Sequence, residues 1–305
     1  MEGANISNPA EKRCAVVTGA NKGIGLEISR QLASNGVTVI LTARDEKRGL
    51  EAVANIKESG PSDVVFHQLD VKDSVSIASL ANFVKTQFGK LDILVNNAGI
   101  HGLVIDSDGV TALQLLGGEM DEEKMKIARG LWQETYEMAE ECLKTNYYGS
   151  KSVTEALFPL LHLSKSPRIV NVSSRRGKLE LIPNEKFKEE VNHVDGLTEE
   201  RLDEWLQSYL KDFKEERLDK HGWPTTTSAY MISKAALNAY TRILAKKFPT
   251  FCINSVHPGA VKTDMNHLWW TETVEEGAHG PVMLALLPDG GPSGHFFDQM
   301  KMSTY

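Results

Sequence analysis

The chain has 305 residues, of which 41% are hydrophobic and 25% charged, and its formal net charge is -7. These proportions are those of an ordinary globular protein and exclude the collagen-like, disordered and membrane-spanning classes. The negative charge argues against a nucleic-acid partner, because a surface that binds nucleic acid needs a basic stripe to displace counterions.

Residues 1–12 form a polar segment with Gly, Asn and Pro, which predicts a flexible tail before the first strand. This segment has no apolar leader, and Glu2 excludes the myristoylation pattern. No later stretch approaches the ~18 apolar residues of a membrane span. The three cysteines lie far apart without a CxxC spacing, which favours free thiols over a metal or disulfide site. We therefore expect a cytoplasmic protein with no metal and no membrane partner.

Short β-branched runs follow the tail and alternate with helical patterns. The stretch after the first run places Ile24, Ile28 and Leu32 on one helix face before the stop signal Asn35-Gly36. Regular alternation of strands and helices is typical of an α/β fold with a doubly wound parallel sheet and helices on both faces. The runs predicted to be strands are 14–18, 37–42, 64–69, 92–96, 168–172 and 252–256.

Two segments interrupt this alternation, at about 101–134 and 178–223. The second contains an amphipathic helix whose apolar residues form one stripe. We interpret both segments as insertions that cover the substrate pocket of a single domain spanning residues 13–305. The stripe consists of Leu202, Trp205, Leu206, Tyr209, Leu210 and Phe213.

A glycine-rich loop joins the first strand to the first helix, with glycines at positions 19, 23 and 25. Glycines at this place allow a tight turn and a close approach of backbone N–H groups to a pyrophosphate, which the helix N-terminus attracts. A flexible turn is the alternative interpretation. The strand before the loop and the helix after it favour a dinucleotide site.

The choice of dinucleotide depends on the end of the second strand, where an acid would bind the ribose of NAD and a base would accommodate the extra phosphate of NADP. Arg44 stands there, and Lys22 adds a positive charge in the glycine-rich loop. Asp45 follows one place later and is the alternative that would serve NAD. The two basic residues favour NADP(H).

Four short motifs follow one another along the chain. They are TGxxxGxG at Gly19, Gly23 and Gly25, NNAG at Asn96 to Gly99, YxxxK at Tyr230 and Lys234, and PG at Pro258 and Gly259. In these motifs and in their order the chain resembles the short-chain dehydrogenase/reductase (SDR) family over about residues 13–305, which implies a Rossmann-type fold and an oxidoreductase that uses a nicotinamide cofactor. The segments KLDILVNNAGI, TNYYG, PRIVNVSS and SKAALNAYTR look most like the plant branch of salutaridine, menthone and carbonyl reductases.

The resemblance implies a role for each matching residue. Tyr230 corresponds to the catalytic acid, Lys234 to the cation beside it, Ser174 to the catalytic serine and Asn146 to the asparagine that holds a relay water. Asp70 corresponds to an adenine contact, and Val261 and Thr263 correspond to carboxamide contacts. The cofactor-binding residues expected in this way are Gly19, Asn21, Lys22, Gly23, Ile24, Gly25, Arg44, Asp70, Val71, Asn97, Ala98, Gly99, Tyr230, Lys234, Pro258, Gly259, Val261 and Thr263.

Carbonyl reduction needs a positioned proton donor for the developing alkoxide. A free tyrosine titrates near ~10, so a nearby cation must stabilise its phenolate, and Lys234 lies one helical turn after Tyr230. Ser174 would hydrogen-bond the substrate oxygen. Taken singly, Tyr230 and Lys234 could be a pair on a helix surface, and Ser174 could be a helix cap. The placement of all of them after the expected strands favours a catalytic site. We interpret His257 as a pocket wall rather than an acid or base.

The expected activity is reversible, NADPH-dependent reduction of a ketone or aldehyde on a small hydrophobic compound such as a terpenoid or alkaloid. One alternative is reduction of a conjugated C=C bond, although a related reductase of this branch with that activity has Glu in place of the tyrosine. Another is a non-catalytic NADP sensor or scaffold, because fold alone does not fix function. We also expect a monomer, with the stripe buried within the chain; a dimer contact is the alternative use of that stripe.

Overall fold

A computed structural model of the protein describes residues 12–105, 109, 111, 127, 130–193, 195–266 and 270–305. The predicted tail, except for Lys12, and most of the first predicted insertion lie outside these residues. In the part of the chain that is described, no helix has both the length and the apolar character needed to cross a membrane.

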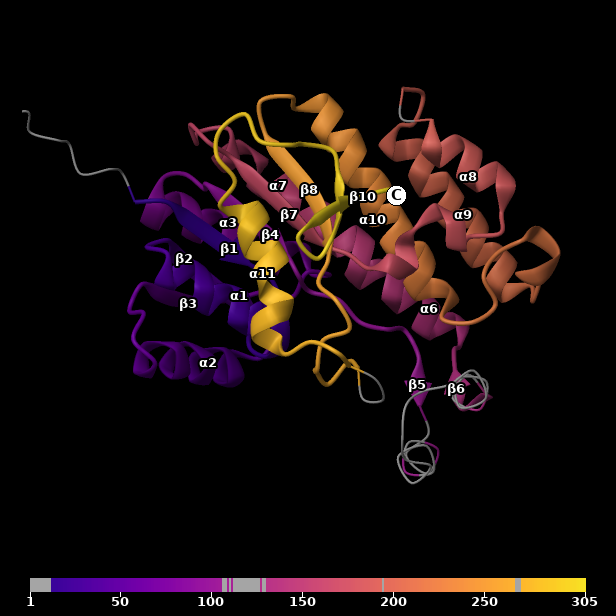
Figure 1. The fold of residues 1–305 in the computed structure, drawn as a ribbon, viewed down its shortest axis with the longest axis horizontal. Coiled ribbons are helices and arrows are strands. Elements are labelled where there is room, and N and C mark those ends of the chain that lie inside the picture. The colour runs from indigo at the N-terminus through magenta and orange to yellow at the C-terminus, as the bar shows by residue number, and fades with distance from the viewer. Residues whose placement is uncertain are drawn as a thin grey trace, which may run out of the picture.

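Eight of the described strands form one sheet, in the order β10-β9-β8-β7-β4-β1-β2-β3 (Figure 1). All neighbours run parallel except β9 and β10, which are antiparallel at one edge. The six predicted strands are confirmed, whereas β9 and β10 were not predicted. The strands are β1 (Cys14–Val17), β2 (Thr38–Ala43), β3 (Val64–Gln68), β4 (Ile93–Asn96), β7 (Arg168–Val172), β8 (Cys252–His257), β9 (Phe296–Asp298) and β10 (Lys301–Ser303).

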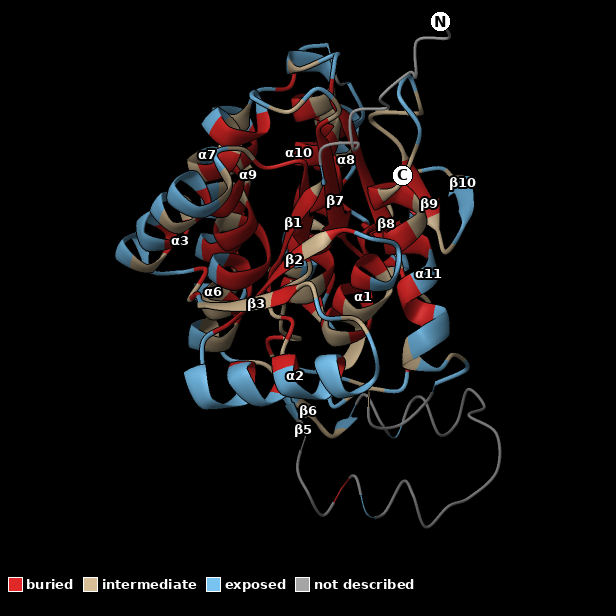
Figure 2. Cartoon of the chain, turned by 90° about the vertical axis from the view of Figure 1, so that its left-hand side faces the viewer, coloured by how far each residue is buried: buried red, intermediate tan, exposed pale blue. Residues whose placement is uncertain are grey.

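Helices cover both faces of the sheet, and a separate apolar core lies under each layer. Figure 2 shows the strands buried between helices whose outer faces are exposed. One layer comprises α1 (Gly23–Ser34), α2 (Glu46–Glu58) and α11 (Val274–Ala285). The other comprises α3 (Ser74–Phe88), α6 (Tyr136–Leu143), the π-helix η1 (Lys144–Gly149), α7 (Ser150–Leu161) and α10 (Ser228–Lys247). The predicted doubly wound α/β fold is therefore confirmed, with a sheet that is mostly parallel.

The second predicted insertion adds helical elements beside α10, on the opposite side of the molecule from α2 and β3 (Figure 1). They are the helices α8 (Glu185–Asn192) and α9 (Glu199–Lys214) and the 3-10 turns η3 (Leu179–Leu181) and η4 (Asp219–His221). A further 3-10 turn, η2 (Arg175–Gly177), lies just before this insertion. The first insertion contains a small antiparallel pair of strands, β5 (Val104–Ile105) and β6 (Trp132–Gln133).

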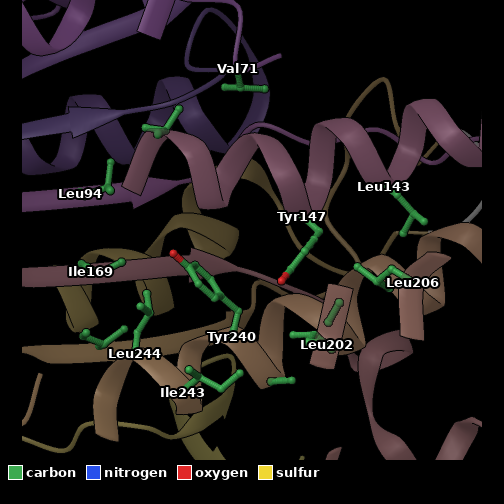
Figure 3. Close-up of a cluster of buried hydrophobic side chains, with 14 of the residues drawn as sticks. Val71, Leu94, Leu143, Tyr147, Ile169, Leu202, Leu206, Tyr240, Ile243 and Leu244 are labelled. Carbon is green, nitrogen blue, oxygen red and sulfur yellow. The ribbon is translucent and has the colours of Figure 1, made fainter. Parts of the chain in front are cut away.

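The apolar stripe predicted for 202–213 lies on α9 and faces the rest of the chain. Leu202, Leu206 and Tyr209 are completely buried in the core that α10 and η1 share. Figure 3 shows Leu202 and Leu206 close to Tyr147 and Leu143. Burying a leucine of this kind stabilises the fold by roughly 1.5–3 kcal/mol relative to exposure. Trp205 and Phe213 of the stripe pack against the same core and are partly buried, so the stripe holds the insertion against the domain.

The sheet has one point at which the strand order reverses. From β1 the chain builds outward through β2 and β3, and then returns to add β4, β7 and β8 on the other side. The loops at the carboxyl ends of β1 and β4 diverge there and leave a crevice, the usual ligand site of a doubly wound sheet. The loop after β1 is the glycine-rich loop, and NNAG begins at the last residue of β4.

Candidate active site

The glycine-rich loop is held in a shape that leaves no room for side chains at two positions. Gly19 has a φ of +63°, a left-handed conformation that glycine adopts without strain. A Cβ at Gly25 would lie 2.7 Å from the carbonyl oxygen of Gly19 and 2.4 Å from Nδ2 of Asn97. The first turn of α1 therefore packs directly against its own loop, with backbone exposed toward the crevice.

Asn97 clamps this loop to the end of β4. Its Nδ2 donates to the carbonyl oxygens of Thr18 (2.9 Å) and Gly19 (3.1 Å). The backbone N–H groups of Asn97 and Ala98 donate in turn to Oγ1 of Thr18, at 2.9 and 3.0 Å. The TG and NNAG motifs, which are far apart in sequence, thus form one hydrogen-bonded unit at the switch point.

A cavity of about 600 Å³, the larger cavity, runs from the loops of β1, β2 and β3 to the start of α10. Most of the predicted cofactor-binding residues line this cavity, and the exceptions are Gly259 and Val261. Other lining residues, among them Lys72, Thr145 and Lys262, were not predicted. The predicted residues that line it are Gly19, Asn21, Lys22, Gly23, Ile24, Gly25, Arg44, Asp70, Val71, Asn97, Ala98, Gly99, Tyr230, Lys234, Pro258 and Thr263.

A second cavity of about 370 Å³, the smaller cavity, shares Tyr230 with the larger one. Ser174, Gly259 and Val261 line this cavity only. Its walls also include Leu103, Trp132, Arg175, Arg176, Leu181 and His257. Of the second predicted insertion, only Leu181 contributes to this wall among the described residues; α9 packs elsewhere.

Tyr230 and Lys234 lie side by side on the first half of α10. The Lys234 Nζ is 5.6 Å from the centroid of the Tyr230 ring and donates to the carbonyl oxygen of Val172 at 2.8 Å. Burial lowers the pKa of Lys234 to about 8. Burial also raises the pKa of Tyr230 to about 12, against the opposing effects of a hydrogen bond with Ser174 and of the Arg176 charge. The phenol is therefore protonated at neutral pH.

Asn146 lines neither cavity and is completely buried in the π-helical turn. Its Oδ1 accepts from the backbone N–H of Ile100 at 2.8 Å, and its Nδ2 donates to the Ile100 carbonyl at 2.9 Å and to Ser233 Oγ at 3.0 Å. Ser233 Oγ donates in turn to the Tyr230 carbonyl at 2.8 Å. The side chain thus ties the loop after β4 to the helix that carries Tyr230. Single-turn π-helices of this kind are frequent at functional sites.

Helix α10, which carries Tyr230, has an N-terminal cap that the sequence did not reveal. Thr227 precedes it in a left-handed conformation (φ +50°) and offers no side-chain cap. The carboxylate of Glu134 replaces that cap, accepting from the backbone N–H groups of Ser228 (3.0 Å) and Ala229 (2.8 Å). Burial raises the pKa of Glu134, and these two bonds oppose the shift. A residue from the first insertion thus fixes the start of the helix two positions before Tyr230.

Lys22 and Asp264 join the two sides of the larger cavity, with an Nζ to Oδ2 distance of 2.6 Å. Both side chains are exposed, so this ion pair contributes little to stability.

His257 lines the smaller cavity, and burial lowers its pKa to about 4, so it is neutral at physiological pH. The described residues contain no group of three or more His, Cys, Asp or Glu side chains arranged to hold a metal ion.

Comparisons with known proteins agree with this geometry. The family model for short chain dehydrogenases matches residues 13–186. Salutaridine reductase from Papaver bracteatum is 56% identical over 299 residues, covering 96% of each chain, and (+)-neomenthol dehydrogenase from Arabidopsis thaliana is 54% identical over 298 residues, covering 96% of this chain and 98% of that protein. The solved structure of salutaridine reductase from Papaver somniferum superposes with a TM-score of 0.89 at 56% identity, covering 94% of this chain and 99% of the other. The chain is therefore an oxidoreductase of the short-chain dehydrogenase/reductase family.

Proposed function

We propose that the protein reduces a ketone or aldehyde group of a small hydrophobic compound to the alcohol, reversibly, with NADPH as the reductant. One observation carries this proposal: Tyr230, with Lys234 beside it, stands on the wall between the two cavities. A proton donor at that place faces both a cofactor site and a substrate site.

The larger cavity fits a dinucleotide. Gly19 and Gly25 have no side chains, so a pyrophosphate can approach the backbone at the N-terminus of α1. The helix dipole favours negative charge at this place. Arg44 and Lys22 would hold the phosphate that distinguishes NADP from NAD, and Asp70 would contact the adenine end. When bound, the cofactor supplies a hydride to the carbonyl carbon.

The chain itself supplies a proton and a polar environment for the substrate oxygen. Tyr230 donates its proton to the developing alkoxide, since its pKa of about 12 keeps the phenol protonated before the reaction. Lys234 stabilises the phenolate that remains. Ser174 lies near the Tyr230 hydroxyl and donates to the same substrate oxygen. We assign Asn146 to positioning Tyr230 through Ile100 and Ser233.

The smaller cavity supports the proposed substrate class. Its apolar wall, formed by side chains such as Leu103, Trp132 and Leu181, suits a compact hydrophobic molecule. The relatives are named for a salutaridine and a neomenthol reaction, which fits a carbonyl or alcohol substrate of this size. Retention of Tyr230 disfavours both the C=C reductase and the non-catalytic sensor.

The test is an NADPH-oxidation screen against terpenoid, alkaloid and small aromatic ketones, with Tyr230→Phe as the key variant. We expect this variant to lose at least about 99% of turnover while it binds NADPH within about twofold of wild type, because the lost group acts as the proton donor. Tyr240→Phe is the matched control, since Tyr240 lies buried on the same helix and its hydroxyl has no hydrogen-bond partner among the described residues. A Tyr230→Phe variant that binds NADPH and keeps a large share of turnover would refute the assignment.

We also propose that the protein is a monomer in the cytoplasm. Four of the six residues of the α9 stripe, which would serve a dimer contact, are buried within their own chain, and this supports a monomer. The three cysteines are free and buried, as expected of a protein from a reducing compartment. Imaging of a fluorescent fusion tests the compartment, and sedimentation tests the monomer.

A further inference from the structure

The loop after β4 brings a second aromatic ring to the junction of the two cavities. Among the described residues, His101 and Tyr230 are the aromatic side chains that line both cavities. Their ring centroids are 4.8 Å apart and their planes are inclined at 69°, an edge-to-face contact. Aromatic rings favour this arrangement, because the positive edge of one ring meets the negative face of the other. His101 thus contacts the proposed proton donor where the cofactor and substrate sites meet.

The backbone just before His101 is anchored to the π-helical turn. The N–H of Ile100 donates to Oδ1 of Asn146 at 2.8 Å, and the carbonyl of Ile100 accepts from Nδ2 of the same side chain at 2.9 Å. Asn146 is completely buried. The Cys142 thiol also donates to this carbonyl, at 3.6 Å. The residue that precedes His101 is therefore held through both of its backbone polar groups.

The backbone just after His101 is held by close packing. Gly102 has a φ of +69°, a left-handed conformation that glycine adopts without strain. A Cβ at this position would lie 2.5 Å from Cβ of Cys142 and 3.2 Å from the carbonyl oxygen of Met138. The loop therefore lies directly on α6, without space for a side chain between them. Because both neighbours of His101 are anchored, its ring has little freedom to move away from Tyr230.

The other contacts of Tyr230 come from different elements. Lys234, on the same helix, places its Nζ 5.6 Å from the centroid of the phenol ring, and the hydroxyl forms a hydrogen bond with Ser174, just after β7. His101 adds a contact from the loop after β4 against the ring itself. The direction of the phenol matters for turnover, because a misplacement of about 1 Å can cost 100-fold in rate.

We infer that His101 is a positioning residue, whose imidazole ring holds the Tyr230 ring at the junction of the two cavities with the phenol hydroxyl toward the substrate oxygen. This inference rests on the proposed carbonyl reduction. It adds to the site a residue that none of the four sequence motifs contains. A proton relay through the imidazole nitrogens is the competing use of the same ring, and the test separates the two.

The test compares His101→Leu and His101→Phe with wild type, on the ketone that gives the highest kcat/KM in the NADPH-oxidation screen. Leucine keeps an apolar side chain but removes the aromatic ring, so kcat should fall about 10-fold while the Kd for NADPH stays within about twofold of wild type. Phenylalanine keeps an aromatic ring and has no titratable nitrogen, so kcat should return to within about threefold of wild type.

A solvent isotope effect separates positioning from a loss of folded protein. A misdirected phenol slows proton transfer to the substrate oxygen, so the effect of D2O on kcat should increase in His101→Leu. Partial unfolding would lower kcat without changing this effect. His67→Leu is the matched control, since His67 packs against Phe83 at the same centroid distance of 4.8 Å and lines neither cavity. It should keep the wild-type kcat and isotope effect.

The outcomes distinguish this inference from the function on which it rests. A wild-type kcat in His101→Leu, or an unchanged isotope effect in that variant, would overturn the positioning role. A His101→Phe variant as slow as His101→Leu would also overturn it, in favour of the proton relay. Absence of NADPH oxidation by wild type with every ketone of the screen would instead overturn the proposed function itself.

Discussion

Removal of the Glu134 carboxylate should weaken the fold and the reaction together. In Glu134→Ala the backbone N–H groups of Ser228 and Ala229 lose their acceptor, and both residues are completely buried, so water cannot easily replace it. An orphaned buried donor costs ~1–3 kcal/mol. The favourable contact of a carboxylate with a helix N-terminus is lost as well.

The expected cost follows from these terms. Two orphaned donors would cost roughly 2–6 kcal/mol, and the burial of Glu134, visible as its raised pKa, offsets part of this loss because the variant no longer buries a carboxylate. We expect a decrease of about 3 kcal/mol in the free energy of unfolding, which corresponds to about 5 °C in Tm for a chain of this size. Because Tyr230 follows one residue after Ala229, kcat should fall about 10-fold while the Kd for NADPH changes less than twofold.

Denaturant unfolding and steady-state kinetics measure the two effects. Glu140→Ala on α6 is the control. Within the described part of the chain, the Glu140 side chain makes one ion pair, a solvent-accessible one with Lys144, and its loss should cost at most about 0.5 kcal/mol. If Glu134→Ala unfolds at the same denaturant concentration as Glu140→Ala, with unchanged kcat, then Glu134 does not fix the start of α10.

Three further predictions concern the cofactor, the buried lysine and the α9 stripe. Arg44→Asp should reduce the preference for NADPH over NADH in kcat/KM by about 10- to 100-fold, and a wild type that uses both cofactors equally would contradict the NADP assignment. Because burial lowers the pKa of Lys234 from 10.5 to about 8, the unfolded chain binds more protons between these pH values. Wild type should therefore gain up to about 3 kcal/mol of stability relative to Lys234→Met as the pH rises from 8 to 10.5, and a constant difference in denaturant midpoints would exclude the shift. Leu206→Ala should cost about 3 kcal/mol without changing sedimentation, which should show a single species near 33.8 kDa at micromolar protein; a stable dimer would contradict the monomer.

The strands, the main helices and the cofactor loop were predictable because their signals are local. The turn and stop signals of α1, for example, lie within a few residues of the elements they end, and the helix ends where Asn35-Gly36 predicts. The β9 and β10 pair was missed for a local reason too. Each strand has only three residues, and the turn between them uses Gln299 with a φ of +56° instead of the glycine or asparagine that usually marks such a turn.

The parts of the site that the sequence did not predict depend on contacts between distant segments. Glu134 caps a helix that begins 94 residues later, and Lys22 pairs with a carboxylate 242 residues away. No spacing rule relates such positions. Arg175 and Arg176 line the smaller cavity together with Tyr230, which their position after a strand does not predict. Asn146 was predicted as a site residue, but its bonds to Ile100 and Ser233 were not.

The start of α10 is a junction for both insertions, and this affects how the enzyme can be re-engineered. Glu134 from the first insertion holds Ser228 through its backbone, and the Tyr209 hydroxyl from the second donates to Ser228 Oγ at 3.0 Å. A chimera that receives either insertion from a relative, in order to acquire a new substrate, also receives a new support for the helix that carries Tyr230. Grafted loops should therefore alter turnover along with selectivity unless positions 134, 209 and 228 are exchanged as a set.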